Sequence, residues 1–92
     1  MAAADASPTI TIYTSAFCAY CVAAKNLLKS RGASWVEVRV DLDASRREEM
    51  LSRARRASVP QIFIGDVHVG GFDELAALDR NGELAPLLAG SP

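Results

Sequence analysis

The stretch TITIYTSAFCAYCVAAKNLLKSRG, residues 9–32, decides the fold because its pattern changes around two cysteines. Residues 9–14 alternate in polarity and are rich in β-branched side chains, which predicts a first strand. From residue 20 to residue 31 apolar side chains recur at helical spacing, and Gly32 follows as a C-terminal cap. We therefore expect both cysteines at the point where a strand passes into a helix.

The remaining elements follow from the same periodicity rules. Residues 34–42 alternate valines with larger side chains and predict a second strand. Ser45 and Glu48 have the spacing of a capping box, which predicts that a helix opens there and ends before Pro60. The rest of the chain predicts a hairpin, residues 59–64 and 67–69 with a turn at Gly65 and Asp66, then helices over residues 72–82 and 83–88.

This β-α-β-α-β-β-α order defines an α/β fold. Two strands joined through a helix normally lie parallel, whereas the strands of a hairpin are antiparallel. The order therefore predicts a four-stranded mixed sheet flanked by helices on both faces. Residues 1–8 have no periodicity and are expected to form a flexible tail, which leaves residues 9–90 as a single domain.

Composition limits the classes of function. With 92 residues, 50% of them hydrophobic, the chain suffices for one core and is too short for two ordinary domains. Its 10 basic and 11 acidic residues give a formal net charge of -1, so no overall basic field exists to hold nucleic acid. No apolar run approaches the roughly 20 residues of a membrane span, and no signal sequence is visible. We expect a monomeric cytoplasmic protein without nucleic-acid or membrane partners.

The spacing of Cys18 and Cys21 allows three interpretations: a redox pair, half of a zinc site, or two small core residues. A zinc site needs about four ligands, and His68 is the only histidine. A helix N-terminus favours the redox pair, because its unpaired amides and dipole stabilise a thiolate at Cys18. Cys21, one turn later, is then within bridging reach and can resolve a mixed disulfide formed at Cys18.

A second motif, SVPQIFI at residues 58–64, supports the redox interpretation. Pro60 opens the predicted strand, where it donates no ladder hydrogen bond and where a cis peptide is often accommodated. The backbone of Val59 is then free to pair with an extended peptide lying over the cysteines. A plain edge-strand proline is the alternative.

Three motifs together, CAYC at 18–21, SVPQIFI at 58–64 and HVGGFDEL at 68–75, resemble those of the dithiol glutaredoxins in order and spacing. The resemblance runs from Thr9 to Leu88. It implies a thioredoxin-like fold and a glutathione-dependent thiol-disulfide oxidoreductase. Such an enzyme reduces protein disulfides and glutathione mixed disulfides, so glutathione, glutathionylated proteins and disulfide-containing proteins are the implied partners.

The resemblance also assigns roles to individual residues. It implies that Cys18 is the attacking thiolate, that Cys21 is the resolving thiol, and that Pro60 lies in cis beside them. Val59 matches a residue whose backbone pairs with the cysteinyl part of glutathione, and the start of the helix at residue 72 matches the site of the γ-glutamyl end. The implied glutathione-binding residues are Tyr20, Ser58, Val59, Pro60, Gly71, Phe72 and Asp73.

Ser15 departs from the family pattern, because many dithiol glutaredoxins carry Lys three residues before the first cysteine. That lysine helps to hold the thiolate and the glycyl carboxylate of glutathione. Arg47 is the nearest positional candidate to replace its contact with the carboxylate, and Arg56 ranks behind it. A solvated helix-face charge is the alternative for Arg47.

Ala19 is the second departure, because the commoner motif has Pro there. Members with a small residue at this place can also hold a [2Fe-2S] cluster between two protomers, with Cys18 and one glutathione from each as ligands. A cluster-bridged dimer, acting as carrier or redox sensor, is therefore one alternative, whereas no metal site is expected in the monomer. A glutaredoxin-like protein reduced by thioredoxin reductase is another.

Overall fold

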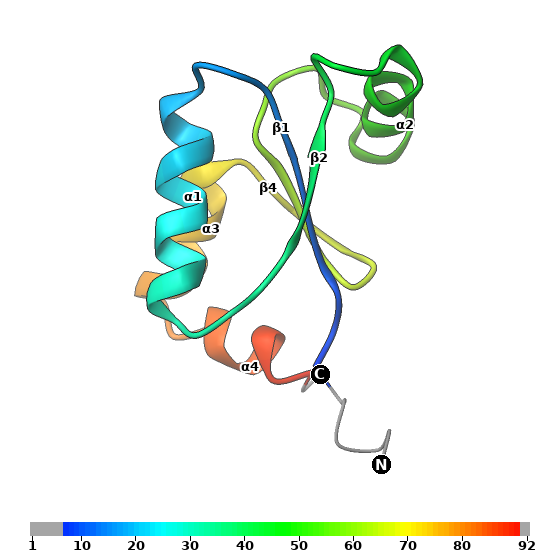
Figure 1. Cartoon of the computed structure of the whole chain (residues 1–92). Helices are drawn as coiled ribbons and strands as arrows, with labels where there is room; N and C mark the ends of the chain where they lie inside the picture. Colours follow the sequence, from blue (N-terminus) through cyan, green and yellow to red (C-terminus); the bar gives the residue numbers. More distant parts are fainter. Residues whose placement is uncertain (1–6, 91–92) are drawn as a thin grey trace.

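The structure is a computed structural model that describes residues 7–90, so residues 1–6 of the predicted tail lie outside the described residues. The β-α-β-α-β-β-α order is confirmed, and so is the short helix predicted at the end, over residues 83–88 (Figure 1). The elements are β1 (Ile10–Thr14), α1 (Ala19–Ser30), β2 (Val36–Arg39), α2 (Ala44–Ala54), β3 (Gln61–Ile64), β4 (Val67–Gly70), α3 (Phe72–Arg80) and α4 (Leu84–Leu88).

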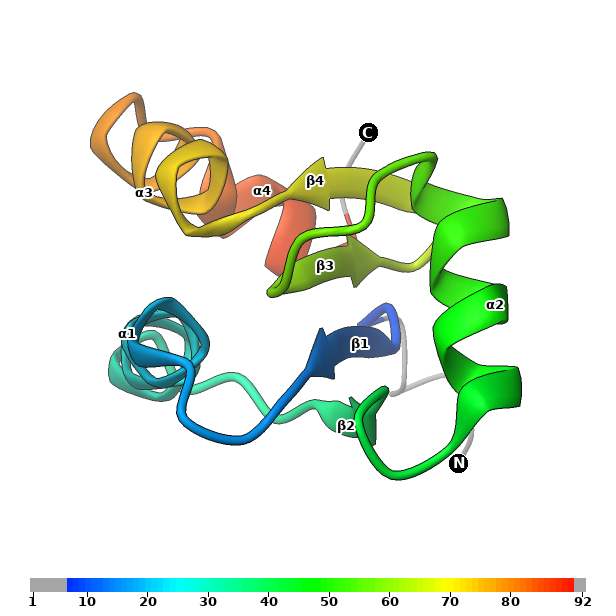
Figure 2. The same cartoon turned by 90° about the horizontal axis from the view of Figure 1, so that it is seen from above.

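The four strands form one mixed sheet in the order β2-β1-β3-β4. β1 pairs in parallel with β2, and β3 pairs antiparallel with β4, as the sequence predicted. β1 also pairs antiparallel with β3, so β2 and β3 run in opposite directions although α2 joins them, which the rule for strands joined through a helix did not predict. Figure 2 shows α1 and α3 on one face of the sheet and α2 on the other. β1 is central, so the loop that leaves its carboxyl end emerges from the middle of the sheet.

Helix α1 begins directly after that loop and packs one face on the sheet. Cys21, Ala24 and Leu28 recur at helical spacing and are all buried. At the other end Gly32 adopts a positive φ of 75°, and its amide donates to the Lys29 carbonyl oxygen. The predicted glycine cap is therefore confirmed, and it fixes the length of the helix that carries the cysteines.

The predicted capping box of α2 is wrong. The N-cap residue is Asp43, whose carboxylate accepts hydrogen bonds from the Ser45 amide at 2.9 Å and the Ser45 hydroxyl at 2.7 Å. Ser45 thus donates its hydroxyl to the true cap. Both residue types are favourable N-caps, and the chain begins the helix at the first of the two.

Strand β2, Val36–Arg39, is shorter at both ends than the strand predicted over residues 34–42. After Arg39 the chain leaves the sheet and turns toward α2.

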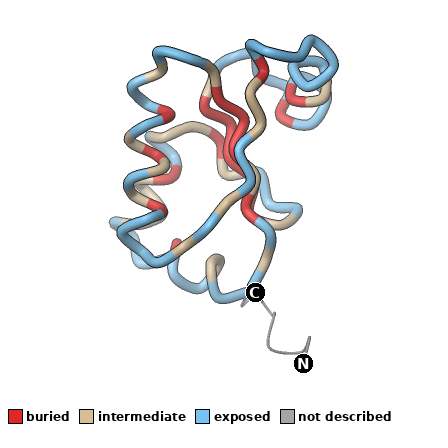
Figure 3. The backbone as a smooth tube through the Cα atoms, in the orientation of Figure 1, coloured by how far each residue is buried: buried red, intermediate tan, exposed pale blue. Residues whose placement is uncertain are grey.

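The sheet separates two apolar clusters, and the buried residues follow its central strands (Figure 3). The larger cluster fills the space between the sheet and helices α1 and α3. The smaller one lies under α2 and is built around Tyr13, Phe63 and Met50. Because alternate residues of a strand face opposite sides, Ile12 belongs to the first cluster and Tyr13 to the second.

A polar contact attaches α2 to this smaller cluster. The hydroxyl of the buried Tyr13 donates to the Glu49 carboxylate at 2.5 Å and accepts from the Arg53 guanidinium at 2.9 Å. The guanidinium carbon of Arg53 also lies 4.0 Å from the centre of the Phe63 ring. Burial, followed by the Glu49 contact, raises the pKa of Tyr13.

We predict that Tyr13→Phe lowers the free energy of unfolding by about 1–2 kcal/mol in urea at pH 7. Hydrogen bonds to charged groups contribute about 1.5–3 kcal/mol, and the partial exposure of Glu49 weakens this one. The folded-state pKa of Tyr13 is raised, so its contribution is complete below pH of about 10 and is lost as the pH rises through the folded pKa. The stability difference between the two proteins should therefore shrink above that pH.

Tyr20→Phe is the matched control, because Tyr20 is 64% exposed. Its effect on unfolding should stay below about 0.5 kcal/mol, as for most surface substitutions. Equal effects of the two substitutions would contradict a role of Tyr13 in holding α2.

Candidate active site around the cysteine pair

Cys18 and Cys21 lie at the strand-to-helix junction predicted for them. Cys18 is the N-cap residue of α1 with an extended backbone, and its sulfur accepts the Cys21 amide at 3.1 Å. Cys21 lies within the first helical turn, and the two sulfurs form a disulfide. Cys18 is half-buried, whereas Cys21 is 2% exposed. The accessible sulfur is therefore that of Cys18, and the covered one can react only with a group already attached there.

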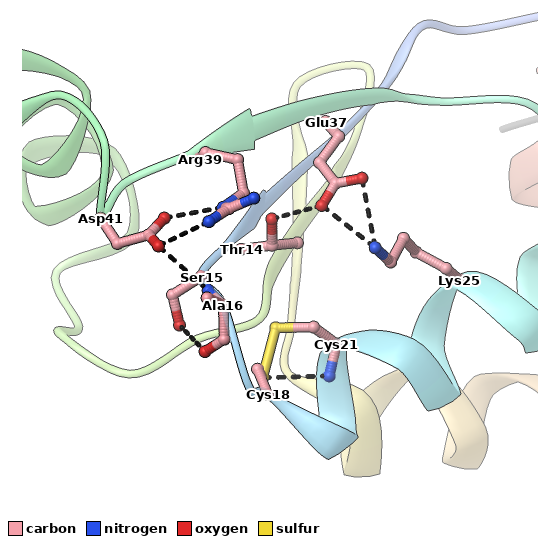
Figure 4. A network of polar contacts seen from close by, with 9 residues as sticks. All are labelled: Thr14, Ser15, Ala16, Cys18, Cys21, Lys25, Glu37, Arg39 and Asp41. Carbon is pink, nitrogen blue, oxygen red and sulfur yellow. Dashed lines mark hydrogen bonds and ion pairs between the residues drawn. A yellow bond between two sulfur atoms is a disulfide. The ribbon is translucent and has the colours of Figure 1, made fainter.

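The loop before Cys18 is held by an ion pair on β2 and the turn after it (Figure 4). Arg39 donates two hydrogen bonds to the Asp41 carboxylate, at 2.7 and 2.6 Å. The same carboxylate accepts the Ala16 amide at 3.2 Å, and the Arg39 contact holds the pKa of Asp41 far below its usual range. The loop is thereby tied to a neighbouring strand two residues before the reactive sulfur.

A second polar cluster lies beside Cys21 (Figure 4). Lys25 of α1 donates to both oxygens of the Glu37 carboxylate, at 3.2 and 3.1 Å, and the Thr14 hydroxyl donates to it at 2.6 Å. The pKa of Glu37 is lowered, mainly by the hydrogen bond from Thr14. These residues link β1, β2 and α1 around the pair and keep the start of the helix in place.

On the other side of the disulfide lies the segment before β3. The Val59–Pro60 peptide is cis, as the family resemblance implied, and the Val59 carbonyl oxygen lies 3.8 Å from the Cys18 sulfur. The fully buried Gln61 supports this segment, because its amide donates to the Ser58 carbonyl at 3.0 Å and to the Ser58 hydroxyl at 3.2 Å. The backbone of Val59 thus lies directly beside the reactive cysteine.

A groove runs from this segment to the start of α3. It brings together all seven glutathione-binding residues that the resemblance implied, whereas Arg47, the positional candidate for the glycyl carboxylate, lies outside it. Tyr20 and Phe72 stack across it, with ring centres 6.3 Å apart and planes inclined by 26°. Its lining residues are Tyr20, Arg56, Ser58, Val59, Pro60, Gly71, Phe72, Asp73 and Glu74.

Arg47 lies in a neighbouring hollow that shares Val59 with the groove. Ser15 lines the same hollow, so Arg47 is close in space to the position where many family members carry the lysine. Asp41 and Asp43 also line it. The hollow and the groove together extend to both sides of Val59, with Arg47 on one side and the α3 N-terminus on the other.

Two groove residues were not among the glutathione contacts that the resemblance implied. Arg56 ranked behind Arg47 for the same role, yet it lines the groove near Gly71 on the other side of Val59. The Glu74 carboxylate accepts a hydrogen bond from the Gly71 amide at 2.7 Å, and this bond is the main cause that lowers the pKa of Glu74. The sequence did contain a signal for this contact, because Glu74 is the third residue of the helix predicted over residues 72–82, a position from which glutamate often caps the helix.

The described part of the chain, residues 7–90, contains no group of three or more His, Cys, Asp or Glu side chains able to hold a metal ion. Within the same residues no helix has the length and apolar character of a membrane span. An accessible sulfur at a helix N-terminus, with a covered partner within bonding distance, is an arrangement suited to thiol-disulfide exchange.

Comparison with known proteins agrees with this chemistry. A family model described as glutaredoxin matches residues 10–69. Glutaredoxin 3 of Escherichia coli is 52% identical over 79 residues, covering 86% of this chain and 95% of the relative.

Solved structures give the same result. Glutaredoxin from Brucella melitensis superposes with a TM-score of 0.82 at 44% identity, covering 92% of each chain. Buckwheat glutaredoxin, solved as a complex with glutathione, has a TM-score of 0.80 at 27% identity and covers 88% of this chain and 76% of its own. The chain therefore belongs to the glutaredoxin family and is a thiol-disulfide oxidoreductase with the thioredoxin-like fold and a redox-active Cys18–Cys21 pair.

Proposed function

We propose that the protein uses glutathione to reduce glutathione mixed disulfides and protein disulfides, as a monomer in the cytoplasm. The observation that carries this proposal is the groove beside Cys18, which extends from the backbone of Val59 to the N-terminus of α3. A thiol peptide lying in it would have its sulfur next to that of Cys18. The buckwheat relative, solved with glutathione, supports the choice of peptide.

With a glutathionylated protein, the Cys18 thiolate attacks the sulfur of the glutathionyl group. The target protein leaves as a thiolate and takes up a proton, and Cys18 now carries the glutathionyl group. A second glutathione, as thiolate, attacks that group, releases Cys18 as a thiolate and forms glutathione disulfide. The helix N-terminus and the Cys21 amide stabilise the anionic sulfur at the start and at the end of the cycle.

With a protein disulfide, Cys18 attacks one sulfur and the other leaves as a thiolate. Cys21 then loses its proton and attacks the Cys18 sulfur, which releases the target as a dithiol and leaves the Cys18–Cys21 disulfide. Two glutathione molecules reduce that disulfide and leave as glutathione disulfide. The burial of Cys21 supports this division of roles, because only a sulfur bonded to Cys18 lies within its reach.

The two ends of the site fit the two charged ends of glutathione. Amides at a helix N-terminus bind carboxylates, and Asp73 adds an acceptor for the γ-glutamyl ammonium group. Arg47 supplies a cation on the opposite side of Val59 for the glycyl carboxylate. Tyr20 and Phe72 form the aromatic walls between these ends, and Ser58 and Pro60 complete the floor.

The [2Fe-2S] dimer stays a prediction from Ala19 alone. Cys18 is exposed enough to serve as a ligand, but residues 7–90 offer no further cysteine except Cys21. Two chains and two glutathione molecules would therefore have to supply the thiolates.

We predict that Cys18→Ser abolishes both activities, whereas Cys21→Ser keeps deglutathionylation and loses the direct reduction of protein disulfides. The hydroxyl of serine does not replace a thiolate nucleophile, and only the second route needs an intramolecular resolving thiol. Both rates are measured with glutathione and glutathione reductase, using a glutathionylated peptide and a disulfide-bonded protein. Loss of both activities in Cys21→Ser would refute the division of roles.

We predict that Arg47→Ala raises the KM for glutathione about fivefold with little change in kcat, because an exposed contact between opposite charges contributes about 1 kcal/mol. Steady-state kinetics at varied glutathione concentration provide the measurement. Arg46→Ala is the control, because Arg46 pairs with Glu49 and does not line the hollow. An unchanged KM in Arg47→Ala would remove this residue from the site.

A further inference from the structure

Arg56 lies at the end of the groove where the β4–α3 turn passes. Arg55, in the left-handed conformation with φ 59°, ends α2 and redirects the chain just before it. A Cβ placed on Gly70 would lie 3.0 Å from one terminal nitrogen of Arg56, and one placed on Gly71 would lie 4.0 Å from the other. The guanidinium therefore lies against the turn that opens α3, and the glycine at position 70 leaves room for it.

The contact that Arg56 makes there is a loose one. Its Nη2 lies 3.8 Å from the Glu74 carboxylate, beyond hydrogen-bond distance. The paired arginines elsewhere are different, since Arg31 and Arg39 each form two hydrogen bonds of 2.8 Å or less with a carboxylate. The side chains of Arg56 and Glu74 are 43% and 49% exposed, so their attraction contributes little to the fold. Arg56 is thus held near the groove without being committed to a partner.

Glu74, in contrast, is fixed. Its carboxylate accepts the Gly71 amide at 2.7 Å, so this amide is already occupied and does not bind a ligand carboxylate. A carboxylate that enters this end of the groove thus finds one amide fewer at the helix N-terminus, and a neighbouring cation strengthens its binding. An arginine guanidinium offers two parallel N–H groups that match the two oxygens of a carboxylate.

Building on the proposed function, we propose that Arg56 binds the α-carboxylate of the γ-glutamyl residue of glutathione. On binding, the guanidinium leaves its loose contact with Glu74 and donates to the ligand. Arg56 thereby determines specificity: the groove selects thiols that carry a carboxylate at this end over thiols that end in an amine or a neutral group.

The test uses one reporter peptide in mixed disulfide with three thiols. The first is glutathione, the second is glutaryl-Cys-Gly, which keeps the terminal carboxylate and lacks the amine, and the third is 4-aminobutyryl-Cys-Gly, which keeps the amine and lacks the carboxylate. Release of the peptide by excess reduced protein gives the second-order rate constant for each. Arg56→Gln should lower this constant about tenfold for the first two thiols, the loss expected for a charge-assisted contact, and less than about twofold for the third.

Arg55→Gln is the matched control, because Arg55 is the adjacent exposed arginine and does not line the groove. It should leave all three constants unchanged. The amine-ended thiol also reports whether Arg56→Gln still folds and keeps a reactive Cys18. An equal loss for all three thiols, or no loss for any, would overturn the role of Arg56. Failure of the wild-type protein to react with the glutathionylated peptide would instead refute the proposed function.

Discussion

The position of Cys18 as the N-cap of α1 is the constraint on which the rest of the site depends. An N-cap residue has an extended backbone, and its side chain faces the unpaired amides of the first turn. Here that side chain carries the sulfur of the redox pair, and the amide of Cys21 donates to this sulfur at 3.1 Å. The same geometry that starts the helix thus provides a site for negative charge on sulfur and places a second cysteine one turn away.

This junction is useful only because its position is fixed. β1 lies in the middle of the sheet and ends in buried residues, so its carboxyl end is paired with a strand on each side. The ion pair of Arg39 with Asp41 ties the loop to β2, and the segment of Val59 and Pro60 approaches from β3. Three segments distant in the sequence therefore meet at one sulfur, and the groove between them determines what reaches it.

The parts of this arrangement that could be predicted from the sequence are those with a local pattern. The alternation of β1, the helical spacing of α1 and the glycine at its end predicted the junction, and the motif order supplied the segment of Pro60. Asp43 and Ser45 both suit an N-cap, so local sequence did not distinguish them. The location of Arg56 depends on where the end of α2 lies relative to the β4–α3 turn, a tertiary relation that no local pattern records.

The source of electrons tests the central claim most directly. A catalytic amount of the protein is mixed with a glutathionylated peptide and NADPH, together with either glutathione and glutathione reductase or thioredoxin reductase alone, and NADPH oxidation is followed. We expect sustained turnover with the glutathione system, absent in Cys18→Ser, and only the uncatalysed background with thioredoxin reductase. Turnover with thioredoxin reductase and none with glutathione would contradict the account.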